Sequence, residues 1–291
     1  MNPRIDRGTP VIVQGLTGRA GRLHARLMRR YGTRIVGGVS PRAEAREVEG
    51  VPLFATCREA VEATGAAASV IFVGAQQLLG AIEEALAAGL RYLVTPAEGM
   101  PVHDALKARR LARAAGAVWI GASTPGMAVA GEVKLGFLPE DSLAPGPLGL
   151  MSKSGTLSYE AGYRLARRGI GTSVWIGVGG DPVKGTRFAE LVPFYAADPQ
   201  TEALLVIGEI GGTDEEEFAQ ALIEHRFPKP VFALVAGASA PEGVTMGHAG
   251  ALVHGDHGSF GAKRAALEAA GVSVFGSLNE MVEGVRARLF G

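Results

Sequence analysis

Two short motifs place an ionisable histidine and a carboxylate where they could do chemistry. The stretch VTMGHAGALV at 244–253 sets His248 among glycines and alanines, and GEIGGTDEEE at 208–217 sets Glu209 at the end of an apolar run. A histidine in such a run is commonly a half-buried core residue with a hydrogen-bond partner. A buried carboxylate at a strand end can instead orient an imidazole or stabilise its charged form. These residues alone leave both readings open.

A glycine turn near the N-terminus is suited to phosphate. The run GLTGRAG at 15–21 follows a strand-like run and resembles a dinucleotide turn, but Thr17 stands where the second glycine of G-x-G-x-x-G belongs. An NAD site needs an acidic residue about 20 residues further on. The next strand-like run instead ends with Ser40 and Arg42. A phosphorylated ribose, as in NADP or coenzyme A, therefore fits better than NAD, unless Arg42 is an ordinary solvated loop residue.

A second helix start also points to an anion. In MSKSGTLSYE, residues 154–156 read Ser-Gly-Thr directly after an apolar run. Such a start leaves backbone N–H groups directed at an anion, although an ordinary helix cap would explain these residues equally well.

The elements that must position these motifs repeat as strand and helix. Strands are predicted over 11–14, 34–39, 68–73, 91–95, 117–121, 148–152, 173–178, 203–209, 230–237 and 272–276, and helices over 58–64, 78–89 and 104–116. Alternating strands and helices predict parallel sheets wrapped by helices. The Pro/Gly-rich segment 138–147 interrupts the rhythm and divides the chain into domains 1–140 and 147–291.

Composition excludes several classes of protein. The 291 residues are 47% hydrophobic with a formal net charge of zero, which argues against a nucleic-acid or anionic-membrane surface. The single cysteine, Cys57, excludes an internal disulfide framework. Since neither a secretory h-region nor a membrane-length apolar run is present, we expect a cytoplasmic, soluble protein. The histidines 248, 254 and 257 have no cysteine nearby, and we expect no metal site. No phosphate-loop motif G-x-x-x-x-G-K-S/T marks an ATP site.

Taken in order, the motifs resemble a known family. The chain closely resembles the α subunit of succinyl-CoA synthetase (succinate–CoA ligase) over essentially its whole length. The resemblance rests on the motifs GLTGRAG, GGVSP, AEGMP, SKSGTLSYE, GVGGDPVKGT, GEIGGTDEEE and MGHAGA. The resemblance implies a Rossmann-like CoA-binding domain followed by a flavodoxin-like domain with a phosphohistidine. It also implies a partner: an ATP-grasp β subunit, in an αβ or α2β2 assembly, that holds magnesium and ATP or GTP.

The resemblance assigns roles by position. It makes His248 the phosphohistidine, Glu209 its carboxylate partner, residues Ser154, Gly155 and Thr156 the phosphate cradle, and Tyr159 a neighbour of the dicarboxylic acid. Coenzyme A would contact Thr17, Gly18, Arg19, Ala20, Arg42, Pro96, Ala97 and Glu98. In the mechanism this implies, the acid is activated as an acyl phosphate, CoA thiolate displaces phosphate, and His248 carries phosphate between this chain and the nucleotide.

Two departures from the family pattern bear on the substrate. Ala43 occupies the place of a usual lysine, with Arg42 beside it, and the PNCPG-type turn reads ASTPG here with Ser123 and Thr124. A ligase for another acid, such as malate or citrate, is therefore the alternative within the family. Outside it, a nicotinamide-dependent oxidoreductase leaves MGHAGA unexplained, and a non-catalytic CoA-binding module predicts loss of His248 or Glu209.

Overall fold

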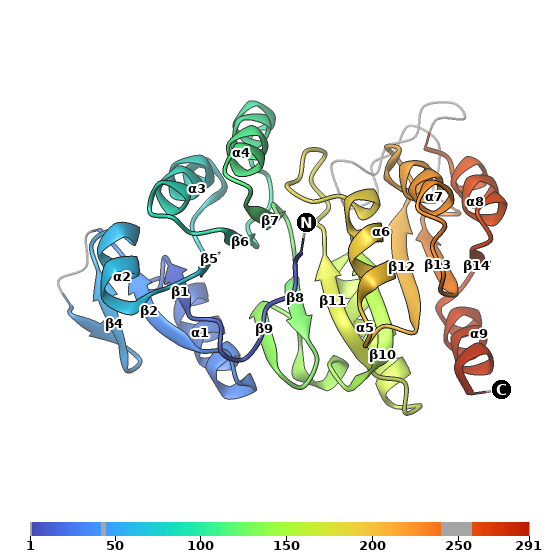
Figure 1. Cartoon of the computed structure of the whole chain (residues 1–291), viewed down its shortest axis with the longest axis horizontal. Helices are drawn as coiled ribbons and strands as arrows, with labels where there is room; N and C mark the ends of the chain where they lie inside the picture. The colour runs from blue at the N-terminus through green and yellow to red at the C-terminus, as the bar shows by residue number, and fades with distance from the viewer. Residues whose placement is uncertain (1, 42–44, 240–257, 291) are drawn as a thin grey trace.

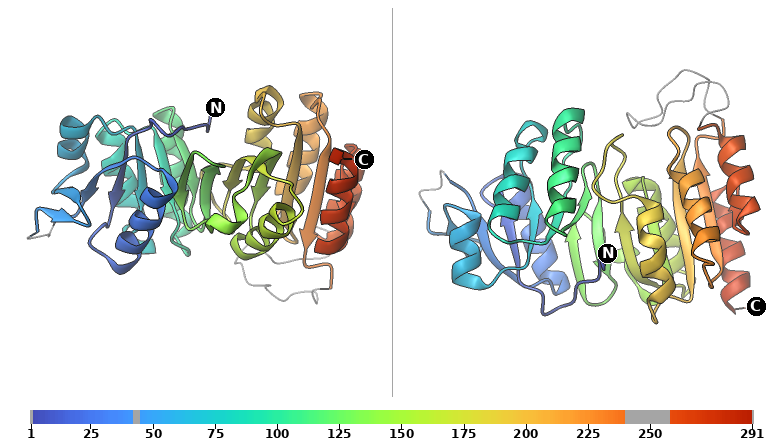
Figure 2. Two further views of the ribbon diagram at one scale, coloured as in Figure 1. Left: turned by 90° about the horizontal axis from the view of Figure 1, so that it is seen from below. Right: turned by 45° about the horizontal axis from the view of Figure 1, so that its top comes forward.

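The structure is a computed structural model that describes residues 2–41, 45–239 and 258–290. Figure 1 shows two α/β halves side by side, the N-terminal half in blue to green and the C-terminal half in yellow to red. The views in Figure 2 show helices on both faces of each sheet. Within the described ranges, no helix is long and apolar enough to cross a membrane.

The N-terminal sheet is parallel apart from one short hairpin. Its strands are β1 (Val11–Gln14), β2 (Ile35–Val39), β3 (Glu47–Val48), β4 (Val51–Phe54), β5 (Ala68–Ile71), β6 (Tyr92–Thr95) and β7 (Val118–Gly121). They lie in the order β3-β4-β2-β1-β5-β6-β7, and β3 pairs antiparallel with β4. Counted from β4 to β7 without β3, the order is 3-2-1-4-5-6, that of a dinucleotide-binding fold.

Helices with one apolar side cover this sheet. They are α1 (Arg19–Tyr31), α2 (Cys57–Thr64), α3 (Leu78–Ala87) and α4 (Val102–Ala114), with a short 3₁₀ turn η1 (Ala75–Gln77) before α3. In α1 the buried residues Gly21, Ala25 and Met28 recur at helical spacing, and Gly32 ends the helix with φ +122°. The predicted helices of this half correspond to α2, α3 and α4.

The second sheet has the flavodoxin order. Its strands are β8 (Gly126–Val129), β9 (Val133–Gly136), β10 (Pro145–Ser152), β11 (Thr172–Gly177), β12 (Ala203–Glu209), β13 (Val231–Ala236) and β14 (Ser273–Phe275), and its helices are η2 (Glu140–Ser142), α5 (Gly155–Ala166), α6 (Phe188–Ala197), α7 (Asp214–Glu224), α8 (Phe260–Ala269) and α9 (Leu278–Phe290). The parallel strands lie in the order β14-β13-β12-β10-β11, which is 2-1-3-4-5 read from β11. The predicted fold class, Rossmann-like followed by flavodoxin-like, is confirmed.

A hairpin joins the two halves. Strands β8 and β9 pair antiparallel, and β8 pairs antiparallel with β11, so residues 126–136 extend the second sheet although they precede the predicted boundary at 140–147. Residues 126–136 form two strands with no helix between them, so they fall outside the strand–helix alternation that marked the other strands in the sequence. Helix α1 of the first half packs against β9, which ties the halves together through apolar contacts.

Candidate active site at the junction of the two sheets

Two of the predicted motifs meet where the second sheet reverses its strand order. Helix α5 begins just beyond the carboxyl end of β10, and Glu209 is the last residue of the neighbouring strand β12. The connections through α5 and α7 leave these strands toward opposite faces of the sheet (Figure 2). A crevice outside the carboxyl ends of such strands is where open α/β sheets bind ligands. The topology therefore brings Ser154 and Glu209 to one edge of the sheet.

The start of α5 has the form of an anion-binding site. Ser154 is its N-cap, with extended backbone, and its Oγ accepts a hydrogen bond of 3.3 Å from the backbone N–H of Leu157. Ser152 in turn donates from its Oγ to the carbonyl of Ser154 at 2.7 Å. The first N–H groups of a helix have no partner inside the helix, and the helix dipole favours negative charge there. Gly155 and Thr156 thus stand where a phosphate cradle is expected.

Glu209 is buried, and the turn that follows it lies next to the described residues on either side of 240–257. The residue is 7% exposed, and its backbone N–H donates to Oε1 of Glu215 at 3.1 Å. The next turn is held by the carbonyl of Ala236, which accepts from Ile210, and by that of Gly258, which accepts from Gly211 at 2.8 Å. The described residues on either side of 240–257 therefore contact the turn that follows Glu209. His248 itself lies outside the described residues, so its pairing with Glu209 stays a prediction.

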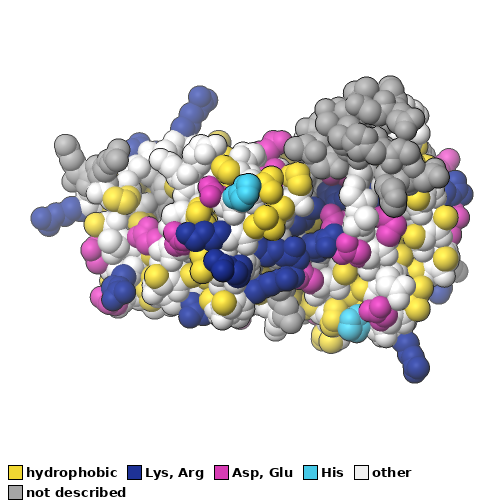
Figure 3. Space-filling model, turned by 90° about the horizontal axis from the view of Figure 1, so that it is seen from above, with side chains coloured by type: hydrophobic (Ala, Val, Ile, Leu, Met, Phe, Trp, Pro, Cys, Tyr) yellow, Lys and Arg dark blue, Asp and Glu magenta, His cyan; other side chains and the backbone are white. Residues whose placement is uncertain are grey.

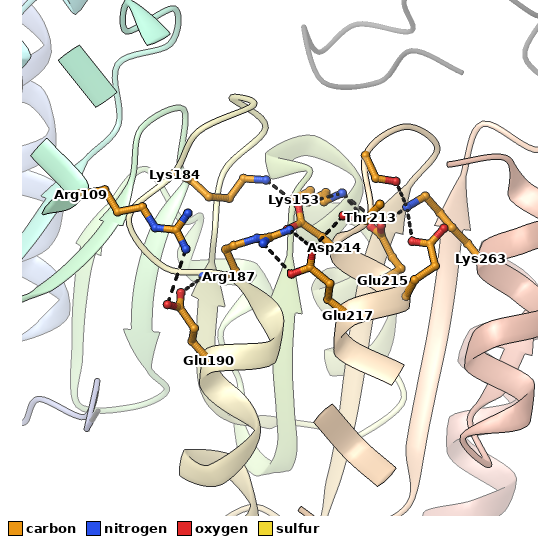
Figure 4. Close-up of polar contacts among 12 residues, drawn as sticks. Arg109, Lys153, Lys184, Arg187, Glu190, Thr213, Asp214, Glu215, Glu217 and Lys263 are labelled. Atoms are coloured by element: carbon orange, nitrogen blue, oxygen red, sulfur yellow. Dashed lines mark hydrogen bonds and ion pairs between the residues drawn. The ribbon is translucent and has the colours of Figure 1, made fainter. Parts of the chain in front are cut away.

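A network of buried ion pairs lies behind these two motifs, and the sequence reasoning missed it. Asp214 accepts from Lys184 at 2.7 Å and pairs with Lys153 at 3.2 Å and with Arg187. Figure 4 shows Lys153, Lys184 and Arg187 converging on Asp214. Lys153 directly precedes the Ser154 cap, and Lys184 and Arg187 come from the loop after β11. The sequence did carry a signal for this network. The acidic run 214–217 is accompanied by lysine or arginine in two other glycine-containing turns, those at 151–156 and 177–187.

Most charges of this network stabilise one another, whereas burial lowers the pKa of Lys184 despite its pair with Asp214. Burial would raise the pKa of the Asp214 carboxyl, but Lys184, Lys153 and Arg187 outweigh it and hold that pKa well below its usual range. Burial likewise works to raise the pKa of Glu215, and the adjacent lysines hold it below its usual value. For Lys153 the opposite balance applies: burial lowers its pKa, and the carboxylates of Glu215 and Asp214 raise it overall. Both carboxylates are therefore ionised at neutral pH, and Lys153 stays charged.

The glycine turn of the N-terminal sheet has the tight geometry that a phosphate site requires. Gly15 has φ +80°, and a Cβ there would lie 2.4 Å from the carbonyl oxygen of Phe72. A Cβ at Gly21 would lie 2.3 Å from the carbonyl oxygen of Gly15, so the start of α1 packs directly on the turn. Gly18 is the N-cap of α1 and makes no side-chain cap bond. The turn thus fits a phosphate-bearing ligand such as coenzyme A.

The predicted coenzyme A contacts around this turn are accessible. Gly18, Arg19 and Ala20 are exposed, and Thr17 is half-buried. The Oγ1 of Thr17 lies 3.1 Å from Oγ of Ser40 at the end of β2, so the residue that replaces the usual glycine bridges two strand ends. Arg42 and Ala43 lie outside the described residues, and the contact of Arg42 with the 3′-phosphate stays a prediction.

The end of β6 links the two halves. Pro96 is buried, Ala97 is half-buried and Glu98 is exposed directly after this strand. The next two residues, Gly99 and Met100, donate backbone hydrogen bonds to the carboxylate of Asp181 at 3.4 and 3.2 Å, and Asp181 belongs to the loop after β11. Burial raises the pKa of Asp181, partly offset by these hydrogen bonds. The carboxyl ends of the two sheets therefore face the same junction.

The ASTPG turn lies at this junction too. Ser123 has φ +58°, its N–H donates to the carbonyl of Ala97 at 2.8 Å, and its carbonyl accepts from Gly180 at 3.4 Å. Thr124 is buried; its Oγ1 donates to the carbonyl of Gly177 and accepts from the N–H of Gly126 at 2.9 Å. The Thr124 hydroxyl thus makes its hydrogen bonds within the turn. Of the two residues that differ from the family pattern here, Ser123 is therefore the one that can contact a ligand.

Tyr159 approaches the same helix start from one turn along α5. A Cβ placed at Gly155 would lie 3.5 Å both from Oη of Tyr159 and from Cβ of Pro125. Burial raises the pKa of Tyr159 to about 12, so its hydroxyl keeps its proton at neutral pH and can donate a hydrogen bond. The position predicted to neighbour the acid is therefore next to the predicted phosphate cradle.

Cations gather where the halves meet. Seen from above, Lys and Arg side chains form a band across the middle of the molecule (Figure 3). At the junction, Arg109 and Arg113 of α4 pair with Glu190 of α6, the former at 3.7 Å. Arg4 pairs with Asp198 at 3.1 Å, so the first residues of the chain also bind the second half.

Among the described residues, no group of three or more His, Cys, Asp or Glu is placed to hold a metal ion.

Comparisons with known proteins agree with this geometry. The family model described as CoA binding domain matches residues 6–99, and that described as CoA-ligase matches residues 151–273. The chain is 46% identical to the ADP-forming succinate–CoA ligase subunit alpha of Aquifex aeolicus, across 93% of this chain and 89% of that protein. It is 41% identical to the malate–CoA ligase subunit alpha of Methylorubrum extorquens, across 99% of each.

A solved structure shows the same fold. ATP citrate lyase from Methanothrix soehngenii, solved with citrate and coenzyme A, superposes with a TM-score of 0.88 at 27% identity, covering 97% of this chain. This chain spans about half the length of that protein, 50% of it. The fold and the two family matches define the class of this chain as a CoA-ligase subunit. The chain belongs to the family of α subunits of ADP-forming CoA ligases, so the resemblance drawn from its motifs is confirmed and the oxidoreductase alternative falls.

Proposed function

We propose that this chain is the α subunit of a succinate–CoA ligase that passes a phosphoryl group through His248. The observation that carries the proposal is the meeting of both sheets' carboxyl ends. The glycine turn and residues 96–98 come from one half, and the start of α5 and Glu209 come from the other. A site of this form can hold a phosphate-bearing thiol and a phosphoryl group side by side.

The chemistry follows from the proposed roles. One nitrogen of His248 takes the terminal phosphoryl group of ATP or GTP as the nucleoside diphosphate leaves, and then passes it to a carboxylate oxygen of the acid, giving an acyl phosphate. The thiol of coenzyme A supplies the acceptor for the acyl group, and inorganic phosphate is released. Splitting one difficult transfer into easier ones is the advantage of a covalent intermediate.

This chain's own residues would position and stabilise the phosphoryl group. Glu209, buried at the end of β12, would hold one nitrogen of the His248 ring so that the other is the nucleophile. The first turn of α5, from Ser154 to Thr156, would receive the phosphoryl charge with backbone N–H groups. The protonated hydroxyl of Tyr159 would hydrogen-bond the acid.

The nucleotide belongs to a partner in this proposal. The sequence contains no phosphate-loop motif, and the relatives are named as alpha subunits. We propose an ATP-grasp β subunit that binds magnesium and ATP or GTP, in an αβ or α2β2 assembly. The α chain alone is then expected to bind coenzyme A and to form no acyl-CoA from ATP.

A second acid has a specific observation in its favour. Ser123 replaces the usual residue of the turn at the junction and is half-buried, and relatives of similar identity include a malate–CoA ligase. A serine hydroxyl at this point would hydrogen-bond the extra hydroxyl of malate or citrate. Malate is therefore the second candidate substrate.

The test is an assay of the assembled enzyme. The chain is purified with its β subunit, and acyl-CoA and nucleoside diphosphate are measured with succinate, malate and citrate, each at several concentrations. We expect the highest kcat/KM with succinate and no product for any acid with His248→Asn. A turnover of His248→Asn close to that of the unaltered chain would reject the phosphohistidine, and a higher kcat/KM with malate would reassign the acid.

A further inference from the structure

Glu215 joins the segments of the second half that carry the proposed phosphoryl site. Its carboxylate is fully buried in the first turn of α7. One oxygen, Oε1, accepts from the backbone N–H of Glu209 at 3.1 Å and pairs with Nζ of Lys153 at 3.0 Å. The other, Oε2, accepts from Lys153 at 3.1 Å and from Lys263. One side chain therefore contacts β12, the residue before the α5 cap, and α8.

The neighbouring backbone is shaped to admit this carboxylate. A Cβ at Gly208 would lie 2.5 Å from Oε1 of Glu215, so a larger residue at that place in β12 would push the carboxylate away. Lys263 also donates to the carbonyl of Gly212 at 3.0 Å and to Glu216 at 2.9 Å, which fastens α8 to the turn after Glu209. The arrangement fixes position because the central charges, those of Glu215, Lys153 and Lys263, are buried and paired.

We propose that Glu215 is a positioning residue for phosphoryl transfer, an inference that rests on the proposed function. It holds the backbone of Glu209 directly and the start of α5 through Lys153. In this way it fixes the distance between Glu209 and the phosphate cradle that phosphoryl transfer needs. It touches neither the phosphoryl group nor the acid. Because a small displacement of a catalytic group costs up to about 100-fold in rate, removing this link should lower kcat strongly. The binding of coenzyme A to the first half should change little.

A matched variant on the same helix separates this role from general packing. Glu216 also pairs with Lys263 but contacts neither Lys153 nor the backbone of Glu209. Glu215→Gln and Glu216→Gln therefore each weaken the contact to α8, and only the former also removes the charge that pairs with Lys153 beside the site. In the assembled enzyme, we expect Glu215→Gln to lower kcat about 10- to 100-fold with KM for coenzyme A within about twofold, and Glu216→Gln to leave kcat within about twofold.

A double variant keeps the test decisive if Glu215→Gln is unstable. Glu215→Gln/Lys263→Met removes both charges of the buried pair, so its melting temperature should recover toward that of the unaltered chain. Its kcat should stay low if Glu215 positions the site. Recovery of kcat together with stability, or equal kcat for Glu215→Gln and Glu216→Gln, would overturn the inference. The phosphoenzyme of the unaltered chain is measured first, since its absence would instead contradict the proposed function.

Discussion

Lys184 and Asp214 form a buried ion pair, and a double-mutant cycle should show a large coupling free energy of unfolding between them. Asp214 is buried and shares its carboxylate among Lys184, Lys153 and Arg187. Lys153 also pairs with Glu215, and Arg187 also pairs with Glu217, whereas the ion pair of Lys184 in the described part of the chain is the one with Asp214. Asp214→Asn should therefore leave Lys184 buried without its ion-pair partner.

The expected magnitudes follow from that difference. Removing one partner of a buried pair costs about 3–5 kcal/mol, so Asp214→Asn should lower the free energy of unfolding by that amount. Lys184→Met leaves Asp214 with two cations and should cost about 1.5–3 kcal/mol, the range for one hydrogen bond to a charged group. The double variant should cost less than the sum of the two by about 1.5 kcal/mol or more, because the stranded lysine is gone.

Urea unfolding at neutral pH measures this cycle. Trp175 is buried in β11 and reports the second half, provided that Trp119 of the first half is replaced by Phe in every chain. The free energies of the four chains then give the coupling between the two residues. Additivity to within about 0.5 kcal/mol would refute the shared buried pair.

Three further predictions concern acid, coenzyme A and the glycine turn. The pKa of Asp214 is depressed in the folded chain, so its contribution to the free energy of unfolding is complete above the unfolded pKa of about 4 and is lost as pH falls below it. The urea midpoint should therefore drop between pH 5 and pH 3. The drop should be smaller in Asp214→Asn/Lys184→Met. Calorimetry should show weaker binding for dephospho-coenzyme A and for Arg42→Ala, and equal affinities would contradict the assignment of the 3′-phosphate. Gly21→Ala should weaken coenzyme A binding about tenfold, because its Cβ would meet the Gly15 carbonyl oxygen at 2.3 Å, whereas Gly80→Ala, with open space around it, should not.

The strands and the glycine turns were predictable because their signals are local. Buried parallel strands read as short apolar runs, and each predicted run, from 11–14 to 272–276, overlaps a strand of the structure. The turns were found through glycines, whose positions at 15 and 21 are dictated by backbone contacts. The strands β8 and β9 were missed because they form an antiparallel hairpin with no helix between them, outside the strand–helix alternation by which the other strands were recognised.

The buried ion network could not be predicted in the same way. Lys153, Asp214 and Lys263 lie on three different elements, and only the order of β10, β12 and β13 in the sheet brings those elements together. Read along the chain, the acidic run at 214–217 looks like a solvated helix start, since acidic residues commonly occupy a first turn. In the structure Glu215 is fully buried, which no local pattern indicates.

The most direct test of the central claim is a phosphoenzyme measurement on the assembled α and β chains. After incubation with ATP labelled in its terminal phosphate, the α chain should carry an acid-labile, base-stable phosphoryl group that maps to His248. Addition of succinate and coenzyme A should discharge it, and Glu209→Gln should slow both steps. Label on another residue, or label on His248 that persists with every acid in the presence of coenzyme A, would contradict the account.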